Sequence, residues 1–535
     1  MELSDKARHD ISNAVKVVIV GGGSAGWMTA AYLSKVLERG VSISLVEAPT
    51  IGSIGVGEAS FSTIQLFFNR LGLQEEDWMS HCNASYKAAI KFVDWNADKQ
   101  QFYHPFQQAS VVNGRSLLEW WRQKANTRRA FDYDCLTVPR LCDTKRSPRF
   151  LDGNVFDRKV AEAGRREYLE NQLPYAYHFD ASLLAEFMMK YAEARGVVRK
   201  LAEVVDVSQD DNGNILALYT NQQEWINGDL FIDCTGFEGK LINKRLNEPF
   251  ISFGDSLPCD RAVAMRIPHD AETAGLNPFT TATALSSGWV WDIPLFNRTG
   301  VGYVYSTAFV KPDAAEAELR RHLSSRADGC DAIHIKMRVG RNRRSWVKNC
   351  VAIGLASGFV EPLESTGIFF IQHGIEQLVN YFPSQQSQEA KKDAFNKAVN
   401  ECMDGVREFL TLHYVANTRS DNPFWKATKH DLLVPAELKE RMKLWKIQLP
   451  SNRTINPNYH GFEGYNYSVM LMGLGYVSEE SPGVVSYMDD SCLPQVFEKL
   501  RSDGERLATE LPSHFEYLIN KYTKYRRQDK LLCGS

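Results

Sequence analysis

The stretch from Val15 to Gly26 restricts the fold of this chain more than any other part of the sequence. Residues 15–20 are almost all apolar and mostly β-branched, which predicts a central strand of a parallel sheet. Gly21, Gly23 and Gly26 follow with GxGxxG spacing as a helical pattern begins. In such a strand–turn–helix unit the glycines let the backbone approach a pyrophosphate, and the helix N-terminus attracts it. The pattern predicts a dinucleotide site.

A second strand is predicted at residues 42–46, and it ends at Glu47, 21 residues after Gly26. An acidic side chain in this place can accept hydrogen bonds from both hydroxyls of an adenosine ribose. Together the features indicate bound FAD or NAD, whereas the glycine motif alone could be a turn without a ligand. They also predict an α/β fold with a Rossmann-like FAD-binding box of the aromatic-hydroxylase type.

We expect this box to occupy residues 14–383, with an aromatic and charged insertion at about 98–166 that faces the substrate. Residues 384–535 carry mainly helical patterns and predict a substructure that covers the substrate. A chain of 535 residues is long enough for such an arrangement.

Composition favours a small-molecule partner. The net charge is −3 and charges of both signs are interspersed, which argues against a nucleic-acid partner or a membrane surface. No apolar stretch reaches the ~20 residues that span a bilayer. The 10 cysteines are scattered without a CxxC pair and the first residues lack a signal-peptide core, so we expect no metal site and a cytoplasmic location.

A helix start is predicted at Thr366 and Gly367, because apolar residues recur at helical spacing from Ile368 onward. Free N–H groups at this start could hold an anion or the edge of a flavin. From spacing alone we favour an ordinary N-cap, and Glu364 would then be an acid that interacts with the helix dipole.

Residues 289–294, Trp-Val-Trp-Asp-Ile-Pro, alternate as a strand does. Trp289 and Trp291 then share one face. Two indoles on one face usually belong to a core, but they could also form a wall between two compartments.

Four segments together closely resemble flavin-dependent tryptophan halogenases, in the same order and over essentially the whole chain: Gly21–Gly26, residues 86–92 with Lys87, residues 289–294, and residues 361–367. The resemblance implies a reaction that uses FAD, supplied as FADH2 by a separate flavin reductase, with O2 and chloride or bromide. Hypohalous acid formed at the flavin passes through an internal tunnel to a lysine that matches Lys87, where L-tryptophan is halogenated. Without the resemblance, Lys91 would be an equal candidate, and Lys87 could be an ordinary solvated lysine.

The resemblance also assigns roles to residues. Lys87 and Glu364 are the catalytic pair, Thr366 and Gly367 bind halide, and Trp289 and Trp291 are the barrier between flavin and substrate. The cofactor contacts are Gly21, Gly22, Gly23, Ser24, Ala25, Gly26, Glu47, Ala59, Val204, Leu355 and Ile368. The substrate contacts are His104 and Phe106 around the indole, and Phe462, Glu463 and Tyr467 toward the amino-acid end.

The Phe462–Glu463 pair resembles the branch that halogenates indole position five, and departs from the position-seven branch, whose loop is longer and carries a Phe-Trp pair. We therefore expect C5, with C6 as the alternative, and a homodimer. Two other functions fit parts of the pattern: an FAD-dependent aromatic monooxygenase, which shares the cradle, and a non-catalytic scaffold on the same fold.

Overall fold

The computed structural model describes residues 14–37, 39–49, 55–123, 130–151, 173–383, 388–477 and 483–532. The chain forms two compact units that interleave along the sequence. Unit 1 comprises Met1–Cys82, Asp180–Gly254 and Met337–Asp404, and unit 2 comprises Asn83–Phe179, Asp255–Lys336 and Gly405–Ser535. The predicted division at residue 383 stays a prediction. Parts of the predicted insertion, 124–129 and 152–166, lie outside the described residues.

Unit 1 is built on a six-stranded sheet in the order β10-β2-β1-β14-β23-β22. Its strands are β1 (Val15–Val20), β2 (Val41–Glu47), β10 (Val198–Leu201), β14 (Leu230–Asp233), β22 (Trp346–Val347) and β23 (Cys350–Ala352). All neighbours pair in parallel except the β22–β23 hairpin. The β-branched residues of β1 are buried from Val17 to Val20, as a central parallel strand requires. The predicted Rossmann-like sheet is confirmed.

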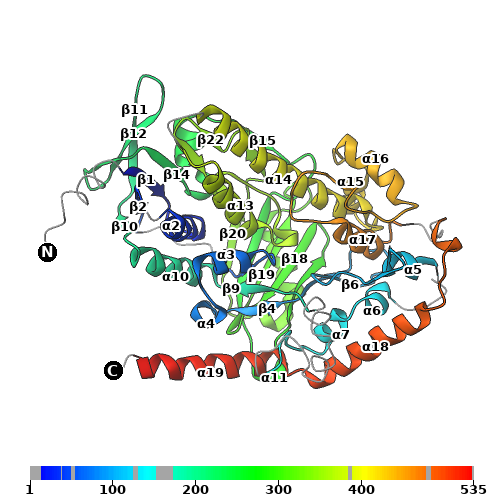
Figure 1. The fold of residues 1–535 in the computed structure, drawn as a ribbon. Helices are drawn as coiled ribbons and strands as arrows, with labels where there is room; N and C mark the ends of the chain where they lie inside the picture. The colour runs from blue at the N-terminus through cyan, green and yellow to red at the C-terminus, as the bar shows by residue number, and fades with distance from the viewer. Residues whose placement is uncertain are drawn as a thin grey trace. The chain divides into compact units, whose positions relative to one another are not determined.

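Helices cover this sheet. They are α2 (Ser24–Val36), α3 (Ile64–Leu71), α4 (Glu75–Trp78), α10 (Ala181–Glu193) and α13 (Gly367–Asn380). Both α10 and α13 pack against α2 (Figure 1). The carboxylate of Asp180 caps α10 by accepting the backbone N–H groups of Ser182 and Leu183.

The remaining strands of unit 1 lie outside the six-stranded sheet. Three form the sheet β11 (Val204–Gln209), β12 (Ile215–Thr220) and β13 (Trp225–Asn227), and three form the sheet β15 (Phe250–Ser252), β21 (Gly340–Asn342) and β24 (Gly358–Phe359). The two-residue strand β3 (Glu58–Ala59) precedes α3.

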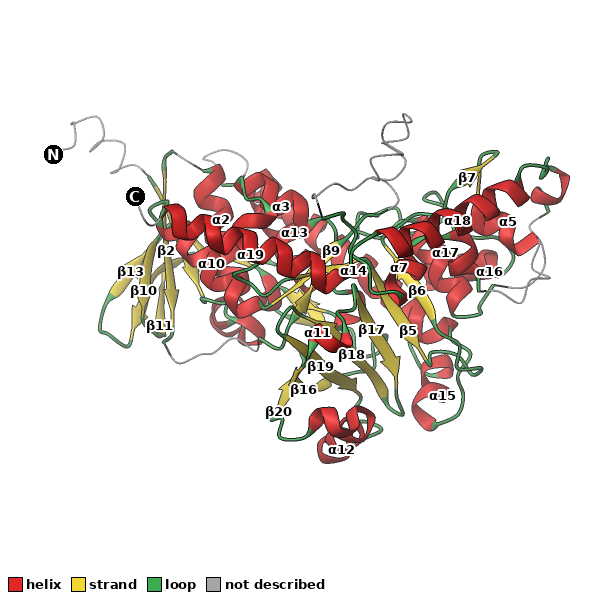
Figure 2. Ribbon diagram, turned by 90° about the horizontal axis from the view of Figure 1, so that it is seen from below, coloured by secondary structure: helices red, strands yellow, loops and turns green. Residues whose placement is uncertain are grey.

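Unit 2 is built on a seven-stranded sheet in the order β20-β16-β19-β18-β17-β5-β6. Its strands are β5 (Ala89–Val93), β6 (Phe102–Pro105), β16 (Arg261–Pro268), β17 (Phe279–Ala284), β18 (Gly288–Pro294), β19 (Arg298–Tyr305) and β20 (Ala332–Lys336). Only β5 and β17 pair in parallel. Helix α12 (Pro312–Leu323) packs on β16 and β19 (Figure 2). The predicted strand at residues 289–294 is confirmed as part of β18.

Other elements of unit 2 surround this sheet. The strands are β4 (Ser85–Lys87), which pairs with β9 (Ala176–Phe179), and the hairpin β7 (Val111–Val112) and β8 (Arg115–Ser116). The helices are α5 (Leu117–Gln123), α6 (Phe131–Cys135), α7 (Val138–Asp143), α11 (Ala271–Ala274), α15 (Pro423–His430), α16 (Ala436–Trp445), α17 (Gly464–Gly473), α18 (Leu493–Glu510) and α19 (His514–Leu532). Helix α14 (Gln388–Ala416) runs from unit 1 into unit 2. Because α14 to α19 make up most of the described residues after 388, the predicted helical C-terminal region is confirmed.

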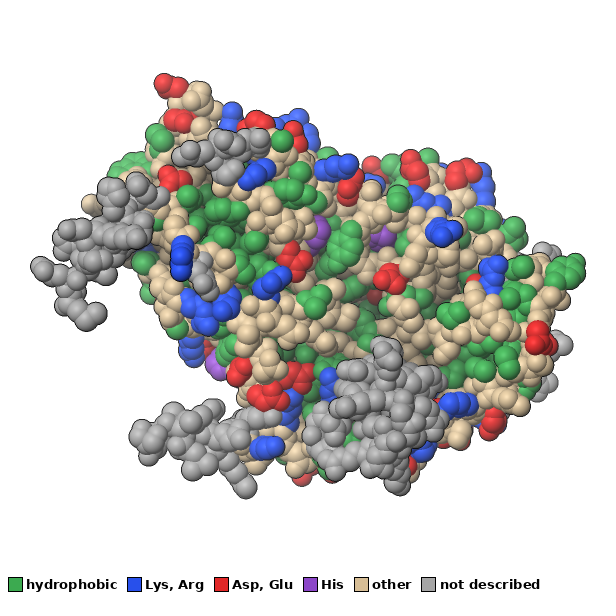
Figure 3. All heavy atoms as spheres, in the orientation of Figure 1, with side chains coloured by type: hydrophobic (Ala, Val, Ile, Leu, Met, Phe, Trp, Pro, Cys, Tyr) green, Lys and Arg blue, Asp and Glu red, His purple; other side chains and the backbone are tan. Residues whose placement is uncertain are grey.

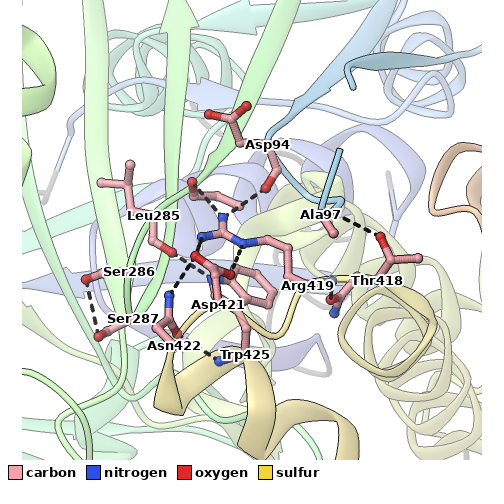
Figure 4. Close-up of polar contacts among 12 residues, drawn as sticks. Asp94, Ala97, Leu285, Ser286, Ser287, Thr418, Arg419, Asp421, Asn422 and Trp425 are labelled. Carbon is pink, nitrogen blue, oxygen red and sulfur yellow. Dashed lines mark hydrogen bonds and ion pairs between the residues drawn. The ribbon is translucent and has the colours of Figure 1, made fainter. Parts of the chain in front are cut away.

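Arg419 fixes the chain after α14 (Figure 4). Its guanidinium donates to the carbonyl oxygens of Asp94 and Ala284, at 2.9 and 3.2 Å, and pairs with the carboxylate of Asp421. It also lies 4.8 Å from the ring centroid of Trp425. One half-buried cation therefore joins the end of β17, the chain after β5 and the start of α15.

The surface carries charges of both signs. On the face shown in Figure 3, basic and acidic side chains are mixed and do not form a continuous patch of one sign. Among the described residues, no helix combines the length and the apolar character that crossing a membrane requires.

Candidate active site

The predicted dinucleotide cradle lies at the carboxyl end of β1. Gly21 has φ +112°, and a Cβ there would lie 2.3 Å from the carbonyl oxygen of Cys234. A Cβ on Gly26 would lie 1.8 Å from the carbonyl oxygen of Gly21. These two positions therefore admit only glycine. Beside Gly23, by contrast, a Cβ would meet nothing within 4 Å, so the turn leaves open space next to the N-terminus of α2.

Ser24, Ala25 and Gly26 form the first turn of α2, where backbone N–H groups have no partner within the helix. The space beside Gly23 and these N–H groups fit the pyrophosphate of a dinucleotide. The hydroxyl of Ser24 donates to the carbonyl of Ala181 at 3.3 Å, which ties the turn to α10. The residues present thus fit the predicted cofactor.

Glu47 ends β2 next to the cradle. A Cβ on Gly22 would lie 1.4 Å from its Oε2 atom, so the carboxylate packs directly on the glycine turn. The indole N–H of Trp27 donates to Oε2 at 3.3 Å, and Arg199 of β10 pairs with Oε1 at 2.5 Å. Arg199, a partner that sequence spacing did not reveal, therefore holds Glu47 beside the glycine turn. The contact of Glu47 with a ribose stays a prediction.

The other predicted cofactor residues also belong to unit 1. Ala59, Val204 and Ile368 are buried, on β3, β11 and α13. Leu355 is half-buried in the 3-10 turn η4 (Gly354–Ala356), and a Cβ on Gly354 would lie 2.7 Å from the Cβ of Ala25. The turn that carries Leu355 therefore touches the start of α2. For all four residues the cofactor contact stays a prediction.

The predicted helix start is confirmed: Thr366 is the N-cap residue of α13. Its hydroxyl is buried and has no hydrogen-bond partner among the described residues. A Cβ on Gly367 would meet nothing within 4 Å. A buried hydroxyl, open space and free helical N–H groups in one place fit a small anion better than a plain N-cap.

Glu364 lies in the 3-10 turn η5 (Pro362–Glu364), only 3% exposed, so it is not the surface acid of the alternative interpretation. Ser365 follows with φ +62° and turns the chain into α13. Glu364 belongs to unit 1 and Lys87 to unit 2, and their action as a pair stays a prediction.

Lys87 ends β4 and is 1% exposed, which excludes a solvated lysine. Its Nζ atom lies 5.4 Å from the ring centroid of Phe106. Burial, then the charge of Lys87, then that of His514 hold the pKa of His178 well below its usual range. Lysine is rarely so buried without a specific role.

Lys91, the alternative candidate, has a different environment. Its Nζ atom lies 3.6 Å from the carboxylate of Asp143 and 4.9 Å from the ring centroid of Tyr103. An ion pair and a cation–π contact account for Lys91 as a structural residue.

The two tryptophans of β18 lie on one face, with ring centroids 6.2 Å apart at 60°. Gly302 on β19 is paired with Trp291, and a Cβ there would lie 2.0 Å from the indole. The indole N–H of Trp291 is buried and has no partner among the described residues. Whether this pair is a barrier stays a prediction.

The predicted indole contacts lie at β6. His104 is 6% exposed, and its Nε2 atom lies 2.9 Å from Nδ2 of Asn466 in α17. Phe106 follows β6, and its backbone N–H donates to the carbonyl of Ala88, next to Lys87. Phe106, predicted to contact the indole, and Lys87, predicted for catalysis, are therefore neighbours in unit 2.

The predicted contacts for the amino-acid end surround the start of α17. Glu463 is exposed, and Gln108 donates to its Oε2 atom at 3.2 Å. Phe462 is buried. The hydroxyl of Tyr467 lies 2.9 Å from Nε2 of His460 inside the fold, and burial raises the pKa of this phenol. In this conformation Tyr467 has a partner of its own, and its contact with a carboxylate stays a prediction.

Sequence reasoning missed five residues that hold the predicted site side chains. They are Arg199 on Glu47, Gln108 on Glu463, Asn466 on His104, His460 on Tyr467, and Phe409, whose ring lies 4.0 Å from Phe462 and 4.6 Å from Tyr467. Most of these contacts join residues far apart in the chain, so no local pattern signals them. Within the described residues, no group of histidine, cysteine and carboxylate side chains is arranged to hold a metal ion.

Comparison with known proteins gives one consistent result. A family profile described as tryptophan halogenase matches residues 16–490. Tryptophan 6-halogenase SttH of Streptomyces toxytricini is 48% identical over 94% of this chain and 98% of its own length. So is 7-chloro-L-tryptophan 6-halogenase KtzR of Kutzneria sp.. The structure of Tar14, a tryptophan C-6 flavin-dependent halogenase from taromycin biosynthesis, superimposes with a TM-score of 0.89 at 47% identity, covering 95% and 99% of the two chains.

The profile covers most of the chain, and the relatives match it nearly end to end. The predicted resemblance and enzyme class are thereby confirmed, and the chain belongs to the tryptophan halogenase family.

Proposed function

We propose that this protein chlorinates or brominates the indole ring of L-tryptophan at C6. The reaction consumes halide, a proton, O2, the substrate and FADH2 from a separate flavin reductase, and yields halotryptophan, FAD and two waters. The prediction of C5 is not supported, because SttH, KtzR and Tar14 are all described as 6-halogenases. The names of these three proteins, which are 47–48% identical to this chain, favour C6 instead.

The observation that carries this proposal is the buried Lys87 beside Phe106. An ammonium there can donate a hydrogen bond to hypohalous acid and make its halogen more electrophilic. A neutral amine can instead form a haloamine, and both routes deliver halogen to the ring held by Phe106 and His104. The aromatic-monooxygenase alternative assigns no role to this lysine.

Residues of unit 1 have the roles of the first stage. The first turn of α2 binds the phosphates of FAD, Glu47 accepts from its ribose, and Thr366 with Gly367 binds halide. When bound as FADH2, the cofactor would supply two of the four electrons that reduce O2, and the halide, oxidised to hypohalous acid, supplies the other two. Glu364 then stabilises the positive charge of the attacked indole or accepts its proton. The predicted reductase, homodimer and cytoplasmic location accompany this proposal as predictions.

The test is to incubate the full chain with FAD, a flavin reductase, NADH, tryptophan and either chloride or bromide. Mass spectrometry and proton NMR should identify 6-halotryptophan, and omission of halide should abolish the product. A 5- or 7-halo product would contradict C6. A hydroxylated product that does not depend on halide would favour the monooxygenase. Adding 7-chlorotryptophan in competition with tryptophan tests whether this protein prefers the substrate that is named for KtzR.

A further inference from the structure

One amide joins the two parts of the proposed tryptophan site. Asn466 lies in the first turn of α17, and its Oδ1 atom accepts the backbone N–H of Glu463 at 2.8 Å. Its Nδ2 atom lies 2.9 Å from Nε2 of His104 on β6. Asn466 and His104 are each 6% exposed, so water does not compete for these contacts. All three residues belong to unit 2.

The backbone fixes the orientation of this amide. A backbone N–H can only donate, so the atom of Asn466 that faces Glu463 must be the oxygen. The atom that faces His104 is then the NH2 group, which can also only donate. Nε2 of His104 must therefore accept and carry no hydrogen, and the ring hydrogen resides on Nδ1. A hydrogen on Nε2 would point at the amide hydrogens.

We propose that Asn466 is a positioning residue that fixes the tautomer and rotation of the His104 ring, and so the indole carbon that is presented for halogenation. The inference rests on the proposed function, in which His104 and Phe106 hold the indole. Since the same amide binds the backbone of Glu463, it sets the ring contact relative to the residue proposed for the substrate amine. The indole and the amino-acid end of tryptophan are therefore held at a fixed position relative to each other. This position determines which ring carbon is attacked.

The tautomer can be measured without substrate. Nitrogen-15 NMR of the full chain labelled at histidine distinguishes Nδ1–H from Nε2–H, and the His104 signals are those that vanish in His104→Gln. The inference predicts an Nδ1–H ring in the wild-type protein. An Nε2–H or doubly protonated ring at neutral pH would overturn it.

The variant Asn466→Asp tests the consequence. A carboxylate can only accept, so the ring hydrogen should move to Nε2, while an acidic residue suits the first helical turn. Misplacing the ring should lower kcat for tryptophan about 10- to 100-fold, with a smaller change in KM, and should increase the share of minor regioisomers. Unchanged kcat and regioisomer ratio would overturn the proposal.

Asn452→Asp is the matched control. Asn452 also accepts a backbone N–H at the start of α17, from Gly464 at 2.7 Å, and its change adds the same charge. It should leave kcat and the regioisomer ratio within about twofold of wild type; an equal loss in both variants would contradict the specific role of Asn466. A wild-type protein that does not halogenate tryptophan counts against the proposed function, whereas an Nε2–H ring in an active enzyme counts against this inference alone.

Discussion

The two units form their candidate sites from different materials. In unit 1 the cradle and the proposed halide site consist largely of backbone: glycine turns, the first N–H groups of α2 and α13, and open space beside Gly23 and Gly367. In unit 2 the site consists of buried polar and aromatic side chains, among them Lys87, His104 and Asn466. A backbone site binds groups common to every turnover, whereas a side-chain site can discriminate among substrates and ring positions.

The difference predicts different sensitivities. Most substitutions leave the backbone N–H groups in place, so binding by the unit 1 site should be lost mainly where a glycine is replaced. Buried polar side chains depend on partners from distant parts of the chain, so unit 2 should fail at many single positions. The following experiments test that contrast.

Lys87→Met should lower halotryptophan formation by about 10²- to 10⁴-fold, because the group that presents the halogen is lost while its volume is kept. Lys91→Met is the matched control on the adjoining strand. It breaks the ion pair with Asp143 and should leave kcat within about threefold. Product analysis by liquid chromatography with saturating tryptophan distinguishes the two, and equal losses would remove the distinction between these lysines.

Glu364→Gln should lower kcat by about 10²- to 10³-fold while FAD still binds, because the change removes one charge and leaves the turn intact. Such a loss would identify Glu364 as a side chain of unit 1 on which kcat depends. Glu361→Gln, three residues earlier and also buried, is the comparison. Rapid-quench measurement of kcat with flavin-binding titrations suffices, and a loss of less than about threefold in Glu364→Gln would make it a structural acid.

Unfolding measured against pH tests the buried acid of unit 2. Asp132 accepts the backbone N–H groups of Tyr103 and Tyr133 at 2.9 and 3.1 Å, and burial raises its pKa from 3.8 to about 6. Between these values the unfolded chain has released a proton that the folded chain still holds. The contribution of Asp132 to the free energy of unfolding is therefore fully present below about pH 4 and is lost as the pH rises through 6. The total loss is up to about 3 kcal/mol.

Asp132→Asn should remove that part of the pH dependence, although it also loses one acceptor and is less stable at every pH. Urea denaturation at pH 4, 5, 6 and 7 measures the slope. If the variant and the wild type show the same slope, Asp132 does not titrate in this range.

Gly23→Ala should fold normally but bind FAD about 10- to 100-fold more weakly, since its Cβ enters the space beside α2 that we assign to the pyrophosphate. Gly26→Ala should instead destabilise the fold, because its Cβ meets the carbonyl of Gly21. Flavin titration and thermal unfolding of both variants separate the effects. Unchanged FAD affinity in Gly23→Ala would contradict the assignment.

The same contrast explains what could be predicted from the sequence. The spacing of Gly21, Gly23 and Gly26 and the apolar period after Thr366 are local, so the sheet of unit 1 and the start of α13 could be predicted. The contact of Asn466 with His104 spans 362 positions, and that of Arg199 with Glu47 crosses between strands. Such pairs depend on the folded chain and leave no periodic signal.

Ring position shows the limit of motif reasoning. The Phe462–Glu463 pair predicts C5, but similar relatives are named for C6. In the proposed function, the position of the indole depends on how the loop before α17 is held. The contacts of Asn466 with His104 and of Gln108 with Glu463, which hold this loop, lie outside the motif.

The central claim is that halide is oxidised by unit 1 and used by unit 2. It is tested by counting both products of Lys87→Met in one reaction: oxidised halide captured by an excess of a small scavenger such as monochlorodimedone, and halotryptophan by mass spectrometry. The account predicts that total oxidised halide, the sum of scavenger product and halotryptophan, stays within about twofold of wild type for each FADH2 consumed. Halotryptophan alone should fall by at least about 10²-fold. Parallel loss of both products, or normal halotryptophan, would contradict it.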